Sequence, residues 1–179
     1  RSGVLSTAVS YLNLFQDPIV ARATSKSDFR ISDLRDPKQP LSLYLVVPPS
    51  DISRTKPLIR LILNQFGRVL TEKLPEKGAN RRILFLLDEF PALGRLDFFE
   101  SALAYLAGYQ IKVFLITQSL NQIEKVYGAN NSVLDNCHIR IAFASNDDKT
   151  AKRISDLLGT KTEFKNQSSL SGRRASFLF

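Results

Sequence analysis

Several residue types are scarce or absent in this 179-residue sequence. Cys137 is the single cysteine and His138 the single histidine, so the chain can form no internal disulfide and no zinc site of cysteine and histidine. Any bound metal must therefore be held by oxygen atoms. Adjacent strand residues point to opposite faces, so Cys137 and His138 cannot act as a paired nucleophile and base. We expect both to be packing residues.

Methionine is also absent, and residue 1 is an arginine. The sequence thus carries no initiator, and we expect it to be an internal or C-terminal fragment of a longer protein. Its longest purely apolar runs, such as residues 83–87, are far below the roughly 18 residues that a membrane span requires. No signal-peptide pattern is present. We therefore expect no membrane span in this chain itself.

The overall composition is that of a packed domain. Hydrophobic residues make up 44% and charged residues 23% of the chain, which argues against disordered, collagen-like and coiled-coil proteins. The length corresponds to about one domain. Lysine and arginine number 25 against 17 aspartates and glutamates, giving a net charge of +8. This excess favours a polyanionic partner such as nucleic acid or acidic lipid.

Short apolar runs alternate with stretches of helical periodicity. The runs predict strands at residues 41–47, 83–87, 113–117 and 138–143, and the stretches predict helices at about 4–15, 57–73, 98–107, 119–126, 131–136 and 146–158. Such alternation predicts an α/β domain with a mainly parallel sheet. Residues 1–40 form a segment that leads into this core at 41–160, and residues 161–179 shift to a basic, polar composition typical of a mobile or edge segment.

Two adjacent carboxylates, Asp88 and Glu89, follow the apolar run at 83–87. They would lie at the carboxyl edge of a parallel sheet, where α/β proteins bind ligands. A magnesium–nucleotide site needs one hard oxygen near the metal, usually reached through its waters, and a second carboxylate that orients and deprotonates the attacking water. Asp88 would serve the Mg²⁺ and Glu89 the water. The alternative is a structural pair in a surface turn.

Gln118 follows the next expected strand and would lie at the same edge. Its amide could touch both a γ-phosphate and the attacking water; the alternative is a turn that caps the following helix. None of the 8 glycines begins a G-x-x-x-x-G-K-[ST] phosphate loop, so the amides and lysine that hold the β- and γ-phosphates are not in this chain. We therefore expect the chain alone to bind ATP poorly.

The sequence resembles the type IV coupling proteins of bacterial conjugation and type IV secretion, of TraG/TraD type. The resemblance covers nearly the whole chain. It rests on Asp88-Glu-Phe-Pro-Ala-Leu-Gly94 after an apolar strand, Gly108-Tyr109 before a strand that ends Ile116-Thr-Gln-Ser119, Leu43-Tyr-Leu-Val-Val-Pro-Pro-Ser-Asp51, Arg1-Ser-Gly-Val-Leu-Ser-Thr7 and Ala23-Thr-Ser-Lys-Ser-Asp-Phe29.

The resemblance implies a hexamer-forming ATPase with a RecA-like P-loop NTPase motor domain, of which residues 41–160 would be a part without the phosphate-loop strand. ATP and Mg²⁺ would be its cofactors. Such a protein is anchored in the bacterial inner membrane, with its motor on the cytoplasmic face. It receives relaxosome-bound DNA or protein substrates, the DNA as a single transfer strand with its relaxase, and passes them to the type IV secretion channel. Asp88 and Glu89 match the family's Walker B acids, and Gln118 matches its polar sensor position.

The sequence departs substantially from the family pattern. Some members are proposed to present an arginine to the neighbouring subunit's phosphate just before the Gln118 strand, but residues 106–112 contain none. Arg95 and Arg140 are then the remaining candidates for that role. The Walker A loop and the membrane anchor would lie outside this chain.

The basic residues leave the nucleic-acid surface open. They gather in two stretches, which could contact DNA phosphates or anionic lipid, or could be solvated. The members are Arg54, Lys56, Arg60, Arg68, Lys73, Lys77, Arg81 and Arg82, then Lys161, Lys165, Arg173 and Arg174. Aromatic residues do not interleave with them in a stacking pattern, so no residue is assigned to nucleic acid.

Two other functions remain compatible with these residues. Another RecA-like DNA translocase or helicase would share the carboxylates and the glutamine, and a non-catalytic docking module would use the carboxylates structurally. The implied fold also inserts the phosphate-loop strand between residues 113–117 and the last strand. We expect residues 138–143 to lie beside a gap, and the isolated chain to be unstable or self-associating.

Overall fold

The structure, a computed structural model, describes residues 2–36, 38–75 and 81–162. Most of the polar segment predicted at 161–179 lies outside the described residues. The helices and strands follow in the order α1 (Ser2–Leu12), α2 (Pro18–Thr24), α3 (Ile52–Leu70), β1 (Ile83–Leu87), α4 (Asp97–Ala102), β2 (Ile111–Leu115), α5 (Leu120–Tyr127) and α6 (Asp148–Leu158). Short 3₁₀ turns lie between them at Asn13–Gln16, Ile31–Arg35, Pro49–Asp51, Phe90–Leu93 and Leu106–Tyr109.

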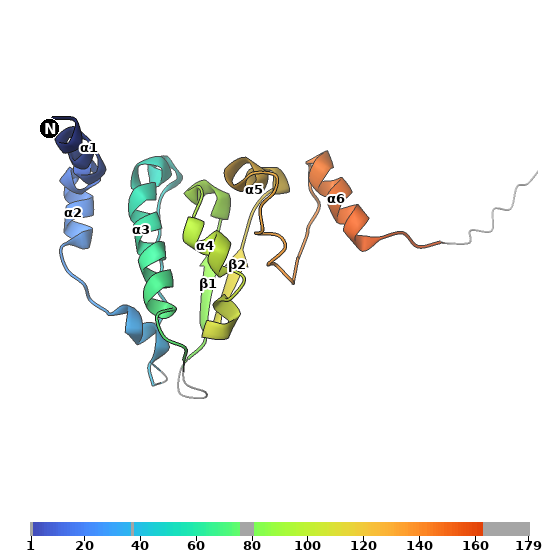
Figure 1. Ribbon diagram of the computed structural model, residues 1–179, viewed down its shortest axis with the longest axis horizontal. Helices are drawn as coiled ribbons and strands as arrows, with labels where there is room; N and C mark the ends of the chain where they lie inside the picture. Colours follow the sequence, from blue (N-terminus) through green and yellow to red (C-terminus); the bar gives the residue numbers. More distant parts are fainter. Residues whose placement is uncertain (1, 37, 76–80, 163–179) are drawn as a thin grey trace, which may run out of the picture.

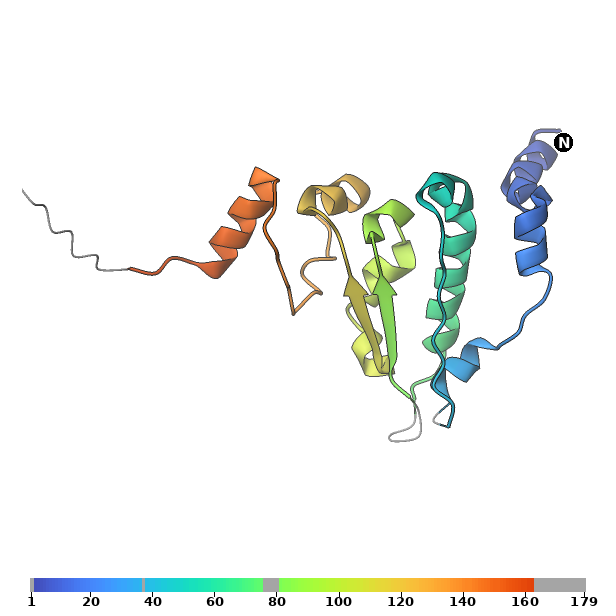
Figure 2. The same cartoon turned by 180° about the vertical axis from the view of Figure 1, so that it is seen from behind.

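Strands β1 and β2 pair in parallel, with Ile83 opposite Ile111 and Leu87 opposite Leu115. The connection between them passes through α4, which lies over one face of the pair; Figure 2 shows the opposite face uncovered. A helical crossover is the ordinary way to join parallel strands. The described residues thus combine helices with a small parallel sheet, which is compatible with the predicted α/β class.

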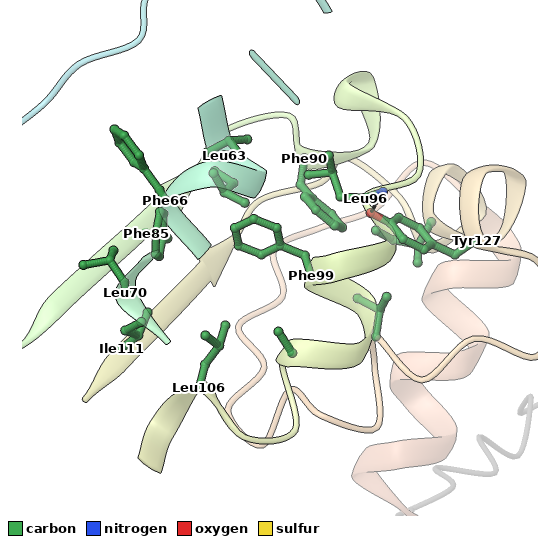
Figure 3. Close-up of a cluster of buried hydrophobic side chains, with 14 residues drawn as sticks. Leu63, Phe66, Leu70, Phe85, Phe90, Leu96, Phe99, Leu106, Ile111 and Tyr127 are labelled. Atoms are coloured by element: carbon green, nitrogen blue, oxygen red, sulfur yellow. Dashed lines mark hydrogen bonds between the residues drawn. The ribbon is translucent and has the colours of Figure 1, made fainter. Parts of the chain in front are cut away.

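One hydrophobic core joins the covered sheet face to the helices (Figure 3). Phe85 of β1 meets Phe99 of α4 edge to face, with ring centroids 5.6 Å apart. Leu63, Phe66 and Leu70 bring α3 onto the same cluster. Successive strand residues alternate between faces, so burial of Phe85 and Leu87 leaves Leu84 and Leu86 exposed on the other face.

Gly67 allows α3 to pack closely against α4. A Cβ atom built at Gly67 would lie 2.0 Å from a ring carbon of Phe98. The sequence alone shows only the cost of glycine inside a helix, up to ~1 kcal/mol against alanine. The structure supplies the reason for it, because the aromatic ring occupies the space of the missing side chain.

The strands predicted at 41–47 and 138–143 are wrong: the described backbone there has no strand assignment. Residues 41–47 run alongside α3 (Figures 1 and 2). Side-chain exposure still alternates along this segment as in a strand, since Tyr44 and Val46 are far more exposed than Leu43 and Leu45. A strand requires a partner for its backbone hydrogen bonds, and a β-rich sequence cannot provide one by itself.

The unpaired segment at 138–143 also overturns the packing prediction for His138, which is exposed, whereas Cys137 is half-buried. Burial raises the pKa of the Cys137 thiol, and the nearby Arg140 partly opposes that change. Ile139, Ile141 and Phe143 are all exposed. The segment has no pairing partner among the described strands, and the gap expected beside it stays a prediction.

Several predicted boundaries differ from those observed. The helix predicted at 57–73 is α3, which begins earlier, so Pro57 lies inside the helix rather than in its first turn. The helix predicted at 98–107 divides into α4 and a 3₁₀ turn. The strand predicted at 113–117 is β2, two residues earlier, because the left-handed turn at Gln110 (φ 58°) brings Ile111 directly into register. Gly159, at φ 74°, ends the last helix as predicted.

Candidate functional site

The backbone turns sharply after β1, at the two acids that the sequence analysis assigned to the site, Asp88 and Glu89. Glu89 has a left-handed backbone (φ 48°, ψ 46°), which is strained for a residue with a side chain and is often found at functional sites. Its backbone N–H donates to Asp88 Oδ1 at 3.1 Å. Beyond the turn, the Phe90 N–H donates to the Ile116 carbonyl at 3.0 Å. The loop after β1 is thereby fastened to the end of β2, and the acids are held at one edge of the sheet.

Two amide side chains hold the carboxylate of Glu89. Gln118 Nε2 donates to Glu89 Oε2 at 2.9 Å, and Gln122 Nε2 donates to Glu89 Oε1 at 3.1 Å. The geometry therefore brings together Asp88, Glu89 and Gln118, as the sequence analysis expected from the carboxyl ends of parallel strands. Asp88 and Gln118 are exposed, whereas Glu89 and Gln122 are partly buried.

Gln122 is the site residue that the sequence analysis missed. It lies in the first turn of α5, three positions after Ser119, the N-cap of that helix. The spacing is that of a capping box, which is the one signal in the sequence that could have singled out Gln122. Its carbonyl oxygen instead accepts from the Gln118 backbone N–H at 3.0 Å and from Thr117 Oγ1 at 2.7 Å.

The loop between the acids and α4 is anchored in the core by Tyr127. The Tyr127 ring stacks on Phe90, with centroids 5.4 Å apart, and its hydroxyl accepts the buried Leu96 N–H at 3.1 Å. Figure 3 shows these three side chains together. Burial raises the pKa of Tyr127, an effect that the hydrogen bond from Leu96 opposes. The acids are thus carried by a loop whose far end is fixed to the core.

The residues at this edge fit one half of a magnesium–nucleotide site. No group of three or more histidine, cysteine or acidic residues within the described ranges could enclose a metal ion. Mg²⁺ at phosphate sites commonly keeps most of its waters and uses one or two carboxylates together with the phosphates. An exposed Asp88 beside Glu89 matches that arrangement.

The two arginines considered for a role towards a neighbouring subunit are engaged within this chain. Arg95 pairs with Asp97 and Glu100, each at 2.9 Å. Arg140 donates to the carbonyls of Leu134 at 2.7 Å and Cys137 at 3.1 Å. Neither contact involves the edge that carries Asp88 and Glu89.

Several residues of the first basic stretch also bond within the chain. Arg54 bridges Asp17 and Asp51, and Arg60 donates to the Arg95 carbonyl at 2.7 Å. Such contacts orient the side chains without identifying a partner for them. In the second stretch, Lys165, Arg173 and Arg174 lie outside the described residues, so the nucleic-acid surface stays unassigned.

The sequence matches a known family over nearly its full length. The family model described as Type IV secretory system Conjugative DNA transfer matches residues 1–177. The chain belongs to this family. This confirms the resemblance to coupling proteins and favours it over an unrelated DNA translocase or helicase.

Curated relatives agree with the family match. The chain is 45% identical to a conjugal transfer protein TraG of Escherichia coli over 184 residues, covering 98% of the chain and 29% of that protein. It is 39% identical to protein VirD4 of Agrobacterium fabrum over 153 residues, covering 84% of the chain and 23% of that protein. The chain thus spans less than a third of these relatives.

Every helix within the described ranges is too short or too polar to cross a membrane.

Proposed function

We propose that this chain is the Walker B part of an ATP-hydrolysing coupling protein with a RecA-like motor domain. The observation that carries the proposal is the carboxylate of Glu89, held by Gln118 across the ends of two parallel strands. In this arrangement the acid can act as the base for the attacking water, and the neighbouring amide can contact the γ-phosphate that the water attacks.

In this proposal each side chain has a distinct task. Asp88 would hold Mg²⁺ through its waters, and Glu89 would orient the attacking water and accept its proton on a carboxylate oxygen. Gln118 exchanges its bond to Glu89 for contacts to the nucleotide. When bound, ATP would supply the phosphoryl group, with ADP as its leaving group, and Mg²⁺ would supply the positive charge that stabilises the transfer. The residues that hold the β- and γ-phosphates lie elsewhere, because this sequence contains no phosphate loop.

The whole protein would use this turnover in conjugation. We propose that it forms a homo-hexamer on the cytoplasmic face of the bacterial inner membrane, anchored by a segment not present in this chain. It would recruit relaxosome-bound DNA with its relaxase and pass them to the type IV secretion channel. Support comes from the family match and from relatives named as conjugal transfer proteins.

The test is Glu89→Gln in the full-length protein that carries this segment. The amide keeps the shape of the side chain and removes its ability to take a proton, so we expect kcat for ATP to fall by about 10²–10⁴-fold and DNA transfer to be lost, with ATP binding retained. Glu72→Gln, at an exposed acid after α3, is the matched control and should leave turnover intact. Undiminished ATP turnover and transfer in Glu89→Gln would instead support a docking module with structural acids.

A further inference from the structure

Both carboxylate oxygens of Glu89 are bonded, and the two donors differ in how firmly they are held. Gln118 is the exposed residue of the segment between β2 and α5 and donates to Oε2. Gln122 lies within α5, is partly buried, and donates to Oε1. One donor therefore belongs to a loop and the other to a helix whose first turn packs beside the site.

The orientation of the Gln122 amide is fixed by its neighbours. The backbone N–H of Gln118 can only donate, so the Gln122 atom 3.0 Å from it must be the oxygen. The hydroxyl of Thr117 lies 2.7 Å from the same oxygen. The NH₂ group of Gln122 is then the end that faces Glu89. A flipped amide would place two donors against the Gln118 N–H and lose the bond to the carboxylate.

We propose that Gln122 is the positioning residue of this site: it holds Glu89 in place while Gln118 is free to exchange. The proposal rests on the ATPase function proposed above. When Gln118 turns to the nucleotide, Oε2 of Glu89 becomes available to the attacking water, and Oε1 stays bonded to Gln122. A base that lost both donors at once would also lose its orientation.

The same residue links the two amides to each other. Because the Gln122 oxygen accepts from the backbone of Gln118, it also fixes the start of the segment that carries the Gln118 side chain. The side chain of Gln122 thus positions both Glu89 and Gln118. Its loss should lower the rate of the chemical step more than the affinity for ATP.

The experiment uses Gln122→Met and Gln122→Glu in the full-length protein. Methionine keeps the length and removes every hydrogen bond, and glutamate keeps the acceptor but replaces the donor by a second carboxylate. We expect kcat to fall about 10–100-fold in both variants, the loss typical when a residue that orients a metal ligand by a hydrogen bond is replaced. KM for ATP should change by less than about twofold. Asn121→Ala is the control, because Asn121 is the preceding residue of α5 and bonds to Asp147 instead.

A double variant separates positioning from a general loss of structure. Glu89→Asp shortens the acid so that it no longer reaches Gln122, and single-turnover assays can follow its residual rate. Adding Gln122→Met to Glu89→Asp should then cost less than about twofold, because residues that act as a unit are non-additive. The same loss in both backgrounds, or a fall matched by Asn121→Ala, would show a structural role and overturn the proposal.

The outcomes also separate this inference from the function on which it rests. If Glu89→Gln abolishes turnover while Gln122→Met keeps the normal kcat, only the role of Gln122 is refuted. If Glu89→Gln leaves turnover intact, the proposed ATPase site fails and the role of Gln122 falls with it.

Discussion

The uncovered sheet face and the unpaired segment at 138–143 predict self-association of the isolated chain. Six apolar side chains there are between 45% and 89% exposed: Leu84, Leu86, Phe114, Ile139, Ile141 and Phe143. Complete burial of one such side chain stabilises by about 1.5–3 kcal/mol, so the exposed fraction of the six corresponds to about 6–12 kcal/mol. Two copies that each bury half of this set gain about as much, which is comparable to the about 4–15 kcal/mol that association costs.

At the favourable ends of these two ranges about 8 kcal/mol remains, which corresponds to a dissociation constant of about 1 μM, so we expect residues 1–179 alone to form larger species at micromolar or higher concentrations. The triple variant Leu84→Thr, Leu86→Thr and Phe114→Thr should shift this association to higher concentration, because threonine keeps the strand preference and removes apolar surface. Lys112→Thr, on the same sheet face by its position in β2, is the matched control and should change little. Sedimentation velocity measures the effect.

A monomer at all concentrations, with one cooperative unfolding transition, would refute this reasoning. It would mean that the exposed side chains are covered within a single copy of the chain, and that the segment at 138–143 needs no further partner. Equal effects of the triple variant and of Lys112→Thr would refute the narrower claim that the apolar sheet face drives association.

Two further predictions concern stability and can be measured in the triple variant. Tyr127→Phe keeps the aromatic ring but leaves the buried Leu96 N–H without its acceptor, so denaturant unfolding should show a loss of about 1–3 kcal/mol; an unchanged midpoint would mean that another acceptor replaces the hydroxyl. Asp147 caps α6, and its hydrogen bond from the Thr150 hydroxyl is the largest cause of a pKa below the ordinary 3.8. Its stabilising effect is complete above 3.8 and is lost as the pH falls through the lower pKa of the folded state. Resonances of α6 should therefore move in an acid titration, and the same response in Asp147→Asn would contradict the assignment.

The sequence alone predicted the strand at 83–87 with its bounds, because a short fully apolar run followed by acids has few other structures available to it. It also predicted which of the site residues meet. The carboxyl ends of neighbouring parallel strands lie at one edge, so Asp88, Glu89 and Gln118 could be placed together before their contacts were known.

The sequence did not predict Gln122, because a glutamine at the third position of a helix usually has a capping role. Its contact with Glu89 depends on how α5 starts relative to the turn after β1. The sequence also could not show that residues 41–47 and 138–143 lack strand pairing in this structure. β-preference describes how well a side chain fits a pleated surface, and that surface has to be supplied by other strands.

The sequence by itself determined the family, the two paired core strands and the residue types at the site, since these depend on local patterns and on motifs. Only the tertiary structure shows which apolar segments are paired, why residue 67 must be a glycine, and which amide fixes the orientation of Glu89. Those outcomes depend on distances between residues far apart in the chain, which the packing of the core sets and local periodicity does not specify.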